Sequence, residues 1–434
     1  MQGQISSKGL LVAGAAFFFC LLSQTASWAG PGPYTFTKIA DAADLVPNSA
    51  TPFGSFEYFP VIGGSNVAFS VSRNLPAHGV YTGDGTSNST IIQRGMSLPN
   101  GAGTIHFLNG YSQDGSVTVF NALSDTGAFE GVFRSTAGVI TPVALPGAMI
   151  PASDGSLPAG SLGFAAIPSA DGGAVAFNGS TSRGQGIYSN VTGSLKAVAD
   201  HFTPVPGIPG AVFSSLSPPA LRGGKMAFQS SQFTTPGNSI VPGQGVYIAD
   251  ATTGVIARVA DLTTAKPGGG TFSNFDAIVA FDGSNVAFQQ TGASAGVYAS
   301  IGGVLRLVAD TNTLIPGSTV PFGHFNGLAI GNGRVVFGGD LASGVADFQT
   351  GVYLWDDGVI TPILRRGDVI DGRTVSNIAF NNESMEGDRL ALQIGSDQGT
   401  AIYETLVPEP GSAMLLGLGL SGWVCWRRRK VGLR

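Results

Sequence analysis

Apolar residues recur along this chain in short runs that follow a fixed order. A run closing on Phe comes first, a Gly-Val-Tyr segment follows, and a later run commonly ends in Val-Ala-Asp, as at 285–288, 296–298 and 308–310. Short runs rich in Val, Ile, Phe and Tyr, separated by Gly, Pro, Asn, Asp or Ser, are typical of half-buried strands with tight turns. The set repeats every ~50–60 residues, which predicts an all-β repeat fold such as a propeller.

Two aromatic series count the repeats. The second strand of each unit is expected to end at Phe69, Phe120, Phe177, Phe228, Phe288, Phe337 and Leu392. The third strand carries Tyr81, Phe133, Tyr188, Tyr247, Tyr298, Tyr353 and Tyr403. In the fifth unit the four expected strands are 271–275, 285–289, 295–299 and 304–309. Seven positions in both series predict a seven-bladed propeller of four-stranded blades over residues 34–406.

The two ends of the repeat region predict how the ring closes. The last unit stops after its third strand, 401–406, whereas the chain begins with a spare run, 35–41, that matches the fourth-strand pattern at 195–200. We therefore expect strand 35–40 to pair with 401–406 and complete the last blade, which also hides strand edges. A linear solenoid or tandem sandwich is the alternative. Residues 231–242 are expected to form a surface loop.

The amino-acid composition limits the kinds of site and partner that the chain could have. Charged residues make up 11% of the chain, well below the roughly 25% of ordinary soluble domains. The two cysteines, Cys20 and Cys425, lie in the terminal apolar runs, which excludes disulfides, thiolate metal sites and a Cys nucleophile from the repeat region. Between residues 30 and 407, 16 basic residues stand against 26 acidic ones, a net charge of −10. A body this acidic argues against nucleic acid as a partner.

The N-terminus has the parts of a secretory signal peptide. Lys8 precedes an apolar run, 10–22, and small residues lie near Ser27 and Ala29. We expect a signal helix that is cleaved after Ala29, so that residues 1–29 direct export through the Sec machinery. A retained membrane anchor is the alternative.

The C-terminus combines three features in order. Val407, Pro408, Glu409 and Pro410 precede an apolar run, 411–426, and the basic residues Arg427, Arg428, Arg429 and Lys430 follow it. Residues 407–434 therefore resemble the PEP-CTERM sorting signal of Gram-negative bacteria. This run of 16 residues falls short of the roughly 20 that span a bilayer comfortably, so the predicted hydrophobic helix suits temporary retention. The basic end should stay cytoplasmic and leave the body outside.

What this resemblance implies is a route rather than a reaction. It implies that an exosortase recognises the Pro-Glu-Pro region and processes the protein. The expected course is a transient inner-membrane intermediate, followed by the cell surface or extracellular matrix. Such hosts typically make exopolysaccharide, which is therefore a candidate partner.

The repeat region also resembles the uncharacterised propeller-like "choice-of-anchor" proteins. The turn at 365–368 and the segment 266–275 carry this resemblance, with Arg-Gly-Asp, Pro-Gly and Phe-Ser-x-Phe features. No activity comes with the resemblance.

Two groups of side chains, one of histidines and one of aspartates, are weak candidates for residues that face the central channel. His106 and His324 occupy similar places in the innermost strands of units two and six, as ligand-binding groups or as solvated side chains. Asp41, Asp200, Asp261 and Asp310 each follow a fourth strand and are expected near the axis. Their carboxylates would suit Ca²⁺, although Asp is also a favoured turn residue. Turn formation is the preferred interpretation, so no metal, cofactor or catalytic residue is assigned.

The sequence thus favours an exported, non-catalytic binding or matrix protein. The alternative is a propeller hydrolase or lyase that acts on extracellular polysaccharide. A His-Glu-x-x-His metalloprotease motif does not occur in the chain.

Overall fold

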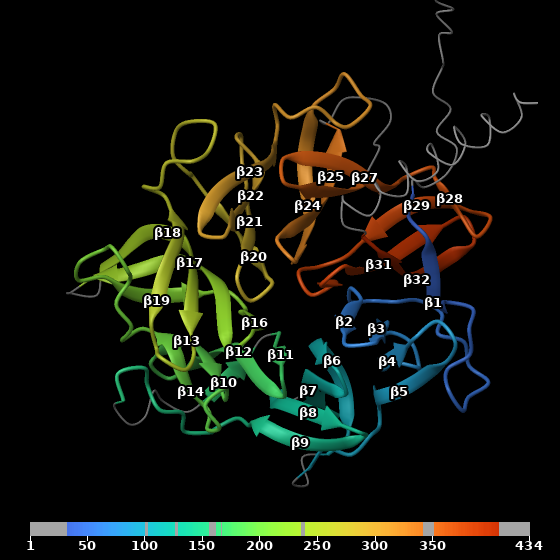
Figure 1. Cartoon of the computed structure of the whole chain (residues 1–434). Coiled ribbons are helices and arrows are strands. Elements are labelled where there is room, and N and C mark those ends of the chain that lie inside the picture. Colours follow the sequence, from blue (N-terminus) through green and yellow to red (C-terminus); the bar gives the residue numbers. More distant parts are fainter. Residues whose placement is uncertain are drawn as a thin grey trace, which may run out of the picture.

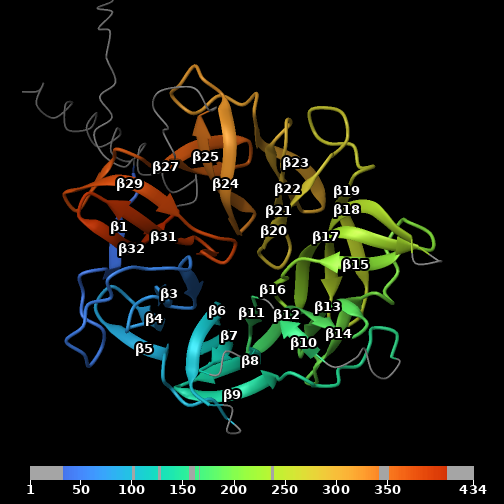
Figure 2. The same cartoon turned by 180° about the vertical axis from the view of Figure 1, so that it is seen from behind.

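The architecture is a ring of β-sheets. The computed structural model describes residues 33–99, 103–125, 129–155, 162–165, 167–235, 239–341 and 351–407. Within these ranges the chain forms strands, turns and loops and no α-helix. Seven sheets fan around one axis (Figures 1 and 2). The predicted seven-bladed propeller is confirmed, whereas the predicted helices at 1–29 and 411–426 lie outside the described residues.

Blades 1 to 3 follow one another in chain order. Blade 1 consists of β2 (Val61–Gly63), β3 (Asn66–Val71), β4 (Gly79–Gly83) and β5 (Asn88–Gln93). Blade 2 consists of β6 (Ile105–Asp114), β7 (Val117–Ser124), β8 (Phe129–Thr136) and β9 (Val139–Ala144). Blade 3 consists of β10 (Leu162–Ala165), β11 (Ser169–Asp171), β12 (Ala174–Thr181), β13 (Gly184–Ser189) and β14 (Lys196–Asp200).

Blades 4 to 6 repeat the plan, and blade 7 combines the two ends of the repeat region. Blade 4 consists of β15 (Val212–Leu216), β16 (Ala220–Arg222), β17 (Lys225–Thr235), β18 (Ser239–Asp250) and β19 (Ile256–Asp261). Blade 5 consists of β20 (Phe275–Phe281), β21 (Val286–Gln290), β22 (Gly296–Ile301) and β23 (Val304–Asp310). Blade 6 consists of β24 (Phe322–Gly331), β25 (Arg334–Leu341), β26 (Gly351–Asp356) and β27 (Val359–Arg365). Blade 7 consists of β1 (Phe36–Asp41), β28 (Val369–Ile370), β29 (Arg373–Ala379), β30 (Met385–Glu386), β31 (Arg389–Ser396) and β32 (Gly399–Leu406).

The first strands of the blades meet around the axis. Contacts run from β2 to β6, β11, β16, β20, β24, β30 and back to β2. The fourth strands are therefore the outermost ones, at the perimeter of the ring (Figure 1). This order decides which residues lie at the centre.

The N-terminal strand closes the ring. Strand β1 pairs antiparallel with β32, with Phe36 opposite Thr405 and Asp41 opposite Ala401. Figure 1 shows the blue β1 alongside the red β32. The predicted pairing of 35–40 with 401–406 is confirmed.

The core is divided among the seams between neighbouring blades. Seven clusters of buried apolar residues occur, and each joins one pair of adjacent blades, including blades 7 and 1. Successive residues of a strand point to opposite faces. Between blades 1 and 2, for example, Ala68 and Val80 face Phe120 and Phe133. The repeated Ala-Phe and Val-Tyr pairs therefore pack the small face of one blade against the large face of the next.

The aromatic series form direct cross-strand pairs. In six blades the second-strand Phe lies opposite the third-strand Tyr or Phe, with ring centroids 5.7–6.1 Å apart. Blade 7 has Leu392 opposite Tyr403 instead. Directly opposed residues of this kind are the side-chain pairs that stabilise a sheet.

A β-bulge recurs in the outer strand of every blade. The ladder skips Ile39, Ile91, Val143, Val198, Val259, Val308 and Ile363. The skipped residue is thus the Val of the Val-Ala-Asp repeat where that repeat is present. A bulge increases local twist, which suits strands that splay outward from an axis.

The bulge explains the Gly of the Gly-Val-Tyr repeat. A Cβ atom at Gly79 would lie 2.5 Å from the Ile92 carbonyl oxygen. At Gly245 it would lie 2.7 Å from the Tyr247 hydroxyl and 2.9 Å from the Ala260 carbonyl oxygen. These positions admit no side chain without displacing the outer strand or the aromatic ring.

Two local predictions were wrong. The inner strand of unit five, expected at 271–275, is β20 (Phe275–Phe281), whose Val279 carbonyl accepts a hydrogen bond from Asn382 of blade 7. The expected surface loop 231–242 is the end of a long β17–β18 hairpin in which Phe233 lies opposite Val241. Phe233 is buried against Phe213 and Tyr247, which holds this hairpin to the core.

Candidate functional site

A short segment of blade 7 occupies the centre of the ring. Asn382, Glu383 and Ser384 lie between β29 and β30 and reach blades 5, 3 and 1. The Glu383 Oε1 atom accepts a hydrogen bond from Ser169 Oγ at 2.6 Å, and Asn382 Nδ2 donates to the Val279 carbonyl at 2.9 Å. Blade 7 is therefore tied by side chains to blades that are not its neighbours in the ring.

The carboxyl of Glu383 is buried among polar groups from several blades. Burial raises the pKa of Glu383, although the Arg222 guanidinium and the Ser169 hydroxyl oppose that shift. Ser169 Oγ also accepts from the Leu221 amide at 3.0 Å, so one hydroxyl joins three blades. A buried acid with a raised pKa is a functional candidate in general. Here its hydrogen bonds connect the blades, which assigns it to holding the ring together.

Sequence reasoning missed this cluster. Its signal is a run of four polar residues, 381–384, at a place where the other units put mainly apolar inner-strand residues. A second missed residue is His78, which is fully buried between blades 1 and 2. Its Nδ1 lies 2.9 Å from the Val71 carbonyl oxygen, and its Nε2 accepts from the Leu108 amide at 3.1 Å. Burial lowers the pKa of His78, which favours the neutral ring that this pattern requires.

The four candidate aspartates lie at the ends of the outermost strands of four different blades. They are therefore at the perimeter of the ring, and the prediction that they lie near the axis was wrong. In each case the residue two positions later donates its amide to Oδ1, at 2.9–3.1 Å. The amide of the aspartate itself donates to a side-chain oxygen three positions later, at 2.7–3.0 Å. The carboxylates of Asp41, Asp200, Asp261 and Asp310 therefore take part in turns. Across the described ranges, no group of three or more His, Cys, Asp and Glu side chains is arranged to hold a metal ion.

The two candidate histidines lie near the starts of long inner strands. His106 Nδ1 is 3.2 Å from the Arg94 guanidinium, and His324 is exposed opposite Asp340. The contacts around the axis come from later residues of the inner strands, such as Ser112, whose hydroxyl accepts from the Ala170 amide. The fold does not bring His106 and His324 together there.

A groove lies on the outer rim between blades 3 and 4. It encloses about 400 Å³ and is lined by 151–155, 196–198 and 202–204, with Ala251 and Gly254 on the other side. Its side chains include the Phe202 ring, the charged Lys196 and Asp154, and the hydroxyls of Ser153 and Thr203.

Hydrogen bonds to Asp200 hold two of the residues that line this groove, Ser153 and Thr203. Asp200 accepts from the Ser153 hydroxyl at 2.5 Å, the Ser153 amide at 2.9 Å and the Thr203 hydroxyl at 3.1 Å. The Ser153 hydroxyl thus donates directly to a carboxylate, without the intervening imidazole of a catalytic triad. The arrangement suits ligand binding by a pre-formed surface.

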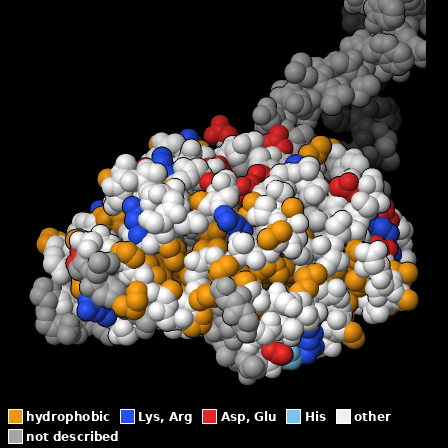
Figure 3. Space-filling view, turned by 90° about the horizontal axis from the view of Figure 1, so that it is seen from below, with side chains coloured by type: hydrophobic (Ala, Val, Ile, Leu, Met, Phe, Trp, Pro, Cys, Tyr) orange, Lys and Arg blue, Asp and Glu red, His pale blue; other side chains and the backbone are white. Residues whose placement is uncertain are grey.

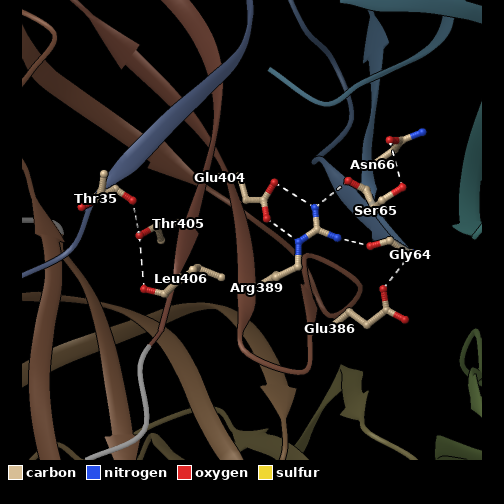
Figure 4. A network of polar contacts seen from close by, with 9 residues as sticks. All are labelled: Thr35, Gly64, Ser65, Asn66, Glu386, Arg389, Glu404, Thr405 and Leu406. Carbon is tan, nitrogen blue, oxygen red and sulfur yellow. Dashed lines mark hydrogen bonds and ion pairs between the residues drawn. The ribbon is translucent and has the colours of Figure 1, made fainter. Parts of the chain in front are cut away.

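The C-terminal end of the propeller lies beside the start of β1. Thr405 Oγ1 donates to the Thr35 carbonyl at 2.9 Å, and Arg389 joins Glu404 to the Gly64 and Ser65 carbonyls (Figure 4). Val407, the first residue of the predicted sorting motif, is buried. Pro408, Glu409, Pro410 and the basic residues 427–430 lie outside the described residues. Within those residues, no helix has the length and apolarity that a bilayer crossing requires.

Comparison with solved structures finds similarities at low identity. The β-propeller domain of the Trilobed protease from Pyrococcus furiosus matches at 10% identity and a TM-score of 0.46, over 82% of this chain and 97% of that one. A Mycobacterium tuberculosis puromycin-hydrolyzing peptidase matches at 13% and 0.46, over 86% of this chain and 54% of that one. Trypanosoma rangeli sialidase matches at 9% and 0.36, over 91% of this chain and 62% of that one. A search of the curated proteins finds no match.

Family models identify both parts of the chain. The PEP-CTERM protein-sorting motif matches residues 406–430, which confirms the predicted sorting signal and implies an exported protein processed by an exosortase. It implies a route through a membrane-anchored intermediate to the cell surface or extracellular space. The "choice-of-anchor" resemblance is not shown, since the model that matches the body, over residues 22–413, is another one. The chain belongs to the family of unknown function DUF7453 and carries a C-terminal PEP-CTERM sorting motif.

Proposed function

We propose that the mature protein is a non-catalytic extracellular binding module that holds matrix polysaccharide in the groove between blades 3 and 4. The groove is the observation that carries this proposal. A volume of about 400 Å³ is within the range of small-molecule sites and accommodates a few sugar rings. Sugar rings present apolar C–H faces as well as hydroxyls, and the groove combines an aromatic ring with polar side chains.

The charge of the body selects among polysaccharides. With 16 basic and 26 acidic residues between residues 30 and 407, the body repels polyanions at low ionic strength. The edge of the ring in Figure 3 has acidic and basic side chains scattered among apolar ones. We therefore assign a neutral glycan, rather than a uronic-acid polymer, as the ligand.

The acidic side chains of the groove support binding over hydrolysis. Glycoside hydrolases commonly use two carboxyl groups on either side of the scissile bond, about 5–9.5 Å apart. Among the described residues that line the groove, Asp154 is the one carboxylate. Asp200 beneath it is occupied by the hydrogen bonds of Ser153, Phe202 and Thr203.

Calorimetric titration of the purified exported protein tests the proposal. A neutral six-unit glucan is expected to bind with a measurable Kd, and a uronic-acid oligosaccharide of equal length more weakly. Phe202→Ala should weaken glucan binding roughly 5- to 10-fold, the size expected for losing one aromatic contact. Phe59→Ala, which removes a partly exposed ring elsewhere, is the matched control and should leave Kd unchanged.

Two results would contradict the proposal. Equal binding by wild type and Phe202→Ala would remove the groove as the site. Release of reducing ends from the glucan, abolished by Asp154→Asn, would favour the hydrolase alternative.

A further inference from the structure

The last described residue of the chain is held firmly in the folded body. Val407 is 0% exposed, and its amide donates to the Asp388 carbonyl at 2.8 Å. Its own carbonyl accepts from Arg334 Nη1 at 2.6 Å. Arg334, only 4% exposed, also pairs with the Asp388 carboxylate. We call Arg334, Asp388 and Val407 the Val407 clamp.

The clamp is adjacent in sequence to the sorting motif. Pro408, Glu409 and Pro410 follow Val407 directly, and the apolar run begins at residue 411. Four residue steps span at most ~14 Å in a fully extended chain. While the apolar run is in the membrane, the edge of blades 6 and 7 that carries the clamp must therefore lie at the membrane surface.

A processing enzyme and the clamp compete for the same segment. Proteolytic enzymes act on locally opened chain, and residues that are buried and hydrogen-bonded become accessible only when that structure opens. The amide and the carbonyl of Val407 are both occupied inside the propeller. An enzyme that recognises the Pro-Glu-Pro triplet thus finds Val407, the residue directly before it, buried and hydrogen-bonded.

We propose that opening of the Val407 clamp controls exosortase processing of the folded protein, with Arg334 as the positioning residue. The cut breaks one peptide bond near the triplet. The acyl carbon takes the oxygen of water or the nitrogen of an acceptor amine, and the departing amine takes the proton. The inference rests on the processing that the sorting motif implies and is independent of glycan binding.

Pulse–chase labelling in cells that express the exosortase tests the clamp. Two variants loosen the triplet from the body by different means: Arg334→Ala removes the side-chain contacts of the clamp, and an eight-residue Gly-Ser insertion between Val407 and Pro408 bypasses it. Each should raise the processing rate several-fold, and the double variant should match the insertion alone. The insertion leaves every propeller residue in place, so it keeps the test valid if Arg334→Ala misfolds.

Controls separate the clamp from general stability. Arg306→Ala removes an exposed arginine, 3.6 Å from Asp357, and should process at the wild-type rate. Arg334→Lys, which keeps the positive charge but has one donor nitrogen in place of the two that contact Val407 and Asp388, should fall between wild type and Arg334→Ala. An insertion variant processed at the wild-type rate or more slowly would overturn the proposal. Because none of these readouts involves a glycan, failure here and failure of the binding proposal remain distinguishable.

Discussion

Blade 7 and the other six blades reach the same shape by different means. The six are each one continuous piece of chain, and each has a cross-strand aromatic pair at its centre. Blade 7 is assembled from both ends of the repeat region and replaces the Phe with Leu392. Of the seven ion pairs between described residues, four include a residue of this blade.

The difference shows where this ring needs extra attachment. A continuous blade is held together partly by its own hairpin turns, which keep neighbouring strands close at little entropic cost. Strand β1 has no hairpin to β32, so the backbone ladder and additional side-chain contacts supply the connection. The Arg373 guanidinium lies 2.5 Å from the Asp41 carboxylate at the end of β1, and Thr405 bonds to Thr35 at its start. Polar contacts in blade 7 thus do what chain continuity does elsewhere.

The largest effect is expected from deleting residues 34–41. The deletion removes β1, uncovers the edge of β32 and takes Ile39 and Ala40 out of the core between blades 7 and 1. We expect loss of cooperative folding, measured as the disappearance of a single thermal transition. A circular permutant that joins 407 to 34 by a linker and opens the Gly302–Gly303 turn supplies the contrast, because it makes blade 7 continuous. It should keep the transition, and a deletion variant that also keeps it would refute the closing role of β1.

A smaller effect is expected from Arg373→Ala. Asp41 is 3% exposed, and the change leaves its carboxylate buried without its closest cation. Removing one partner of such a pair typically costs about 3–5 kcal/mol. Urea unfolding should show a loss of that order, against less than about 1 kcal/mol for Arg306→Ala, whose pair is exposed. Equal losses in the two variants would mean that the Asp41 pair has no special part in closure. In the circular permutant the Arg373→Ala loss should leave the protein folded.

The smallest effect is the pH dependence of the stability. We compare His78, between blades 1 and 2, with Asp41, at the end of β1 in blade 7. Burial lowers the pKa of His78, between blades 1 and 2, so the unfolded chain takes up the proton first, near pH 6.5. The free energy of unfolding should therefore fall as the pH drops from 7 to 5. Burial opposes ionisation of Asp41, but the Ala43 amide and Arg373 outweigh it and lower its pKa. The Asp41 contribution is thus retained in this window and lost only below its unfolded pKa, near pH 3.8.

Urea titrations at several pH values measure this slope. His78→Asn should reduce the slope, whereas Arg373→Ala should lower the stability throughout the window. Burial also lowers the pKa of His201, so His201 adds to the slope in the same direction. The His201→Asn variant measures that part of the slope separately. A wild-type slope of zero between pH 7 and 5 would contradict the assignment of His78.

Much of the fold could be predicted because each unit of the repeat carries the same short sequence patterns. The aromatic series located two strands in each unit, and a spare strand pattern at 35–41 predicted the closure. The candidate site was less accessible. The aspartates have the same local pattern in a turn and in a metal site, and only the order of strands in a blade decides whether they lie near the axis. Glu383 and His78 are single residues without a repeat, and their partners lie 214 and 30 positions away.

By itself the sequence determined the blade count, the closing strand and the sorting motif, because each depends on residues close together or on a periodic pattern. Tertiary structure decided what lies at the centre and what is held at the exit. Glu383 reaches across the axis to Ser169, and Arg334 of blade 6 holds Val407 of blade 7, because ring closure brings remote residues into contact. Such contacts depend on the relative positions of whole blades, and local patterns carry no information about those positions.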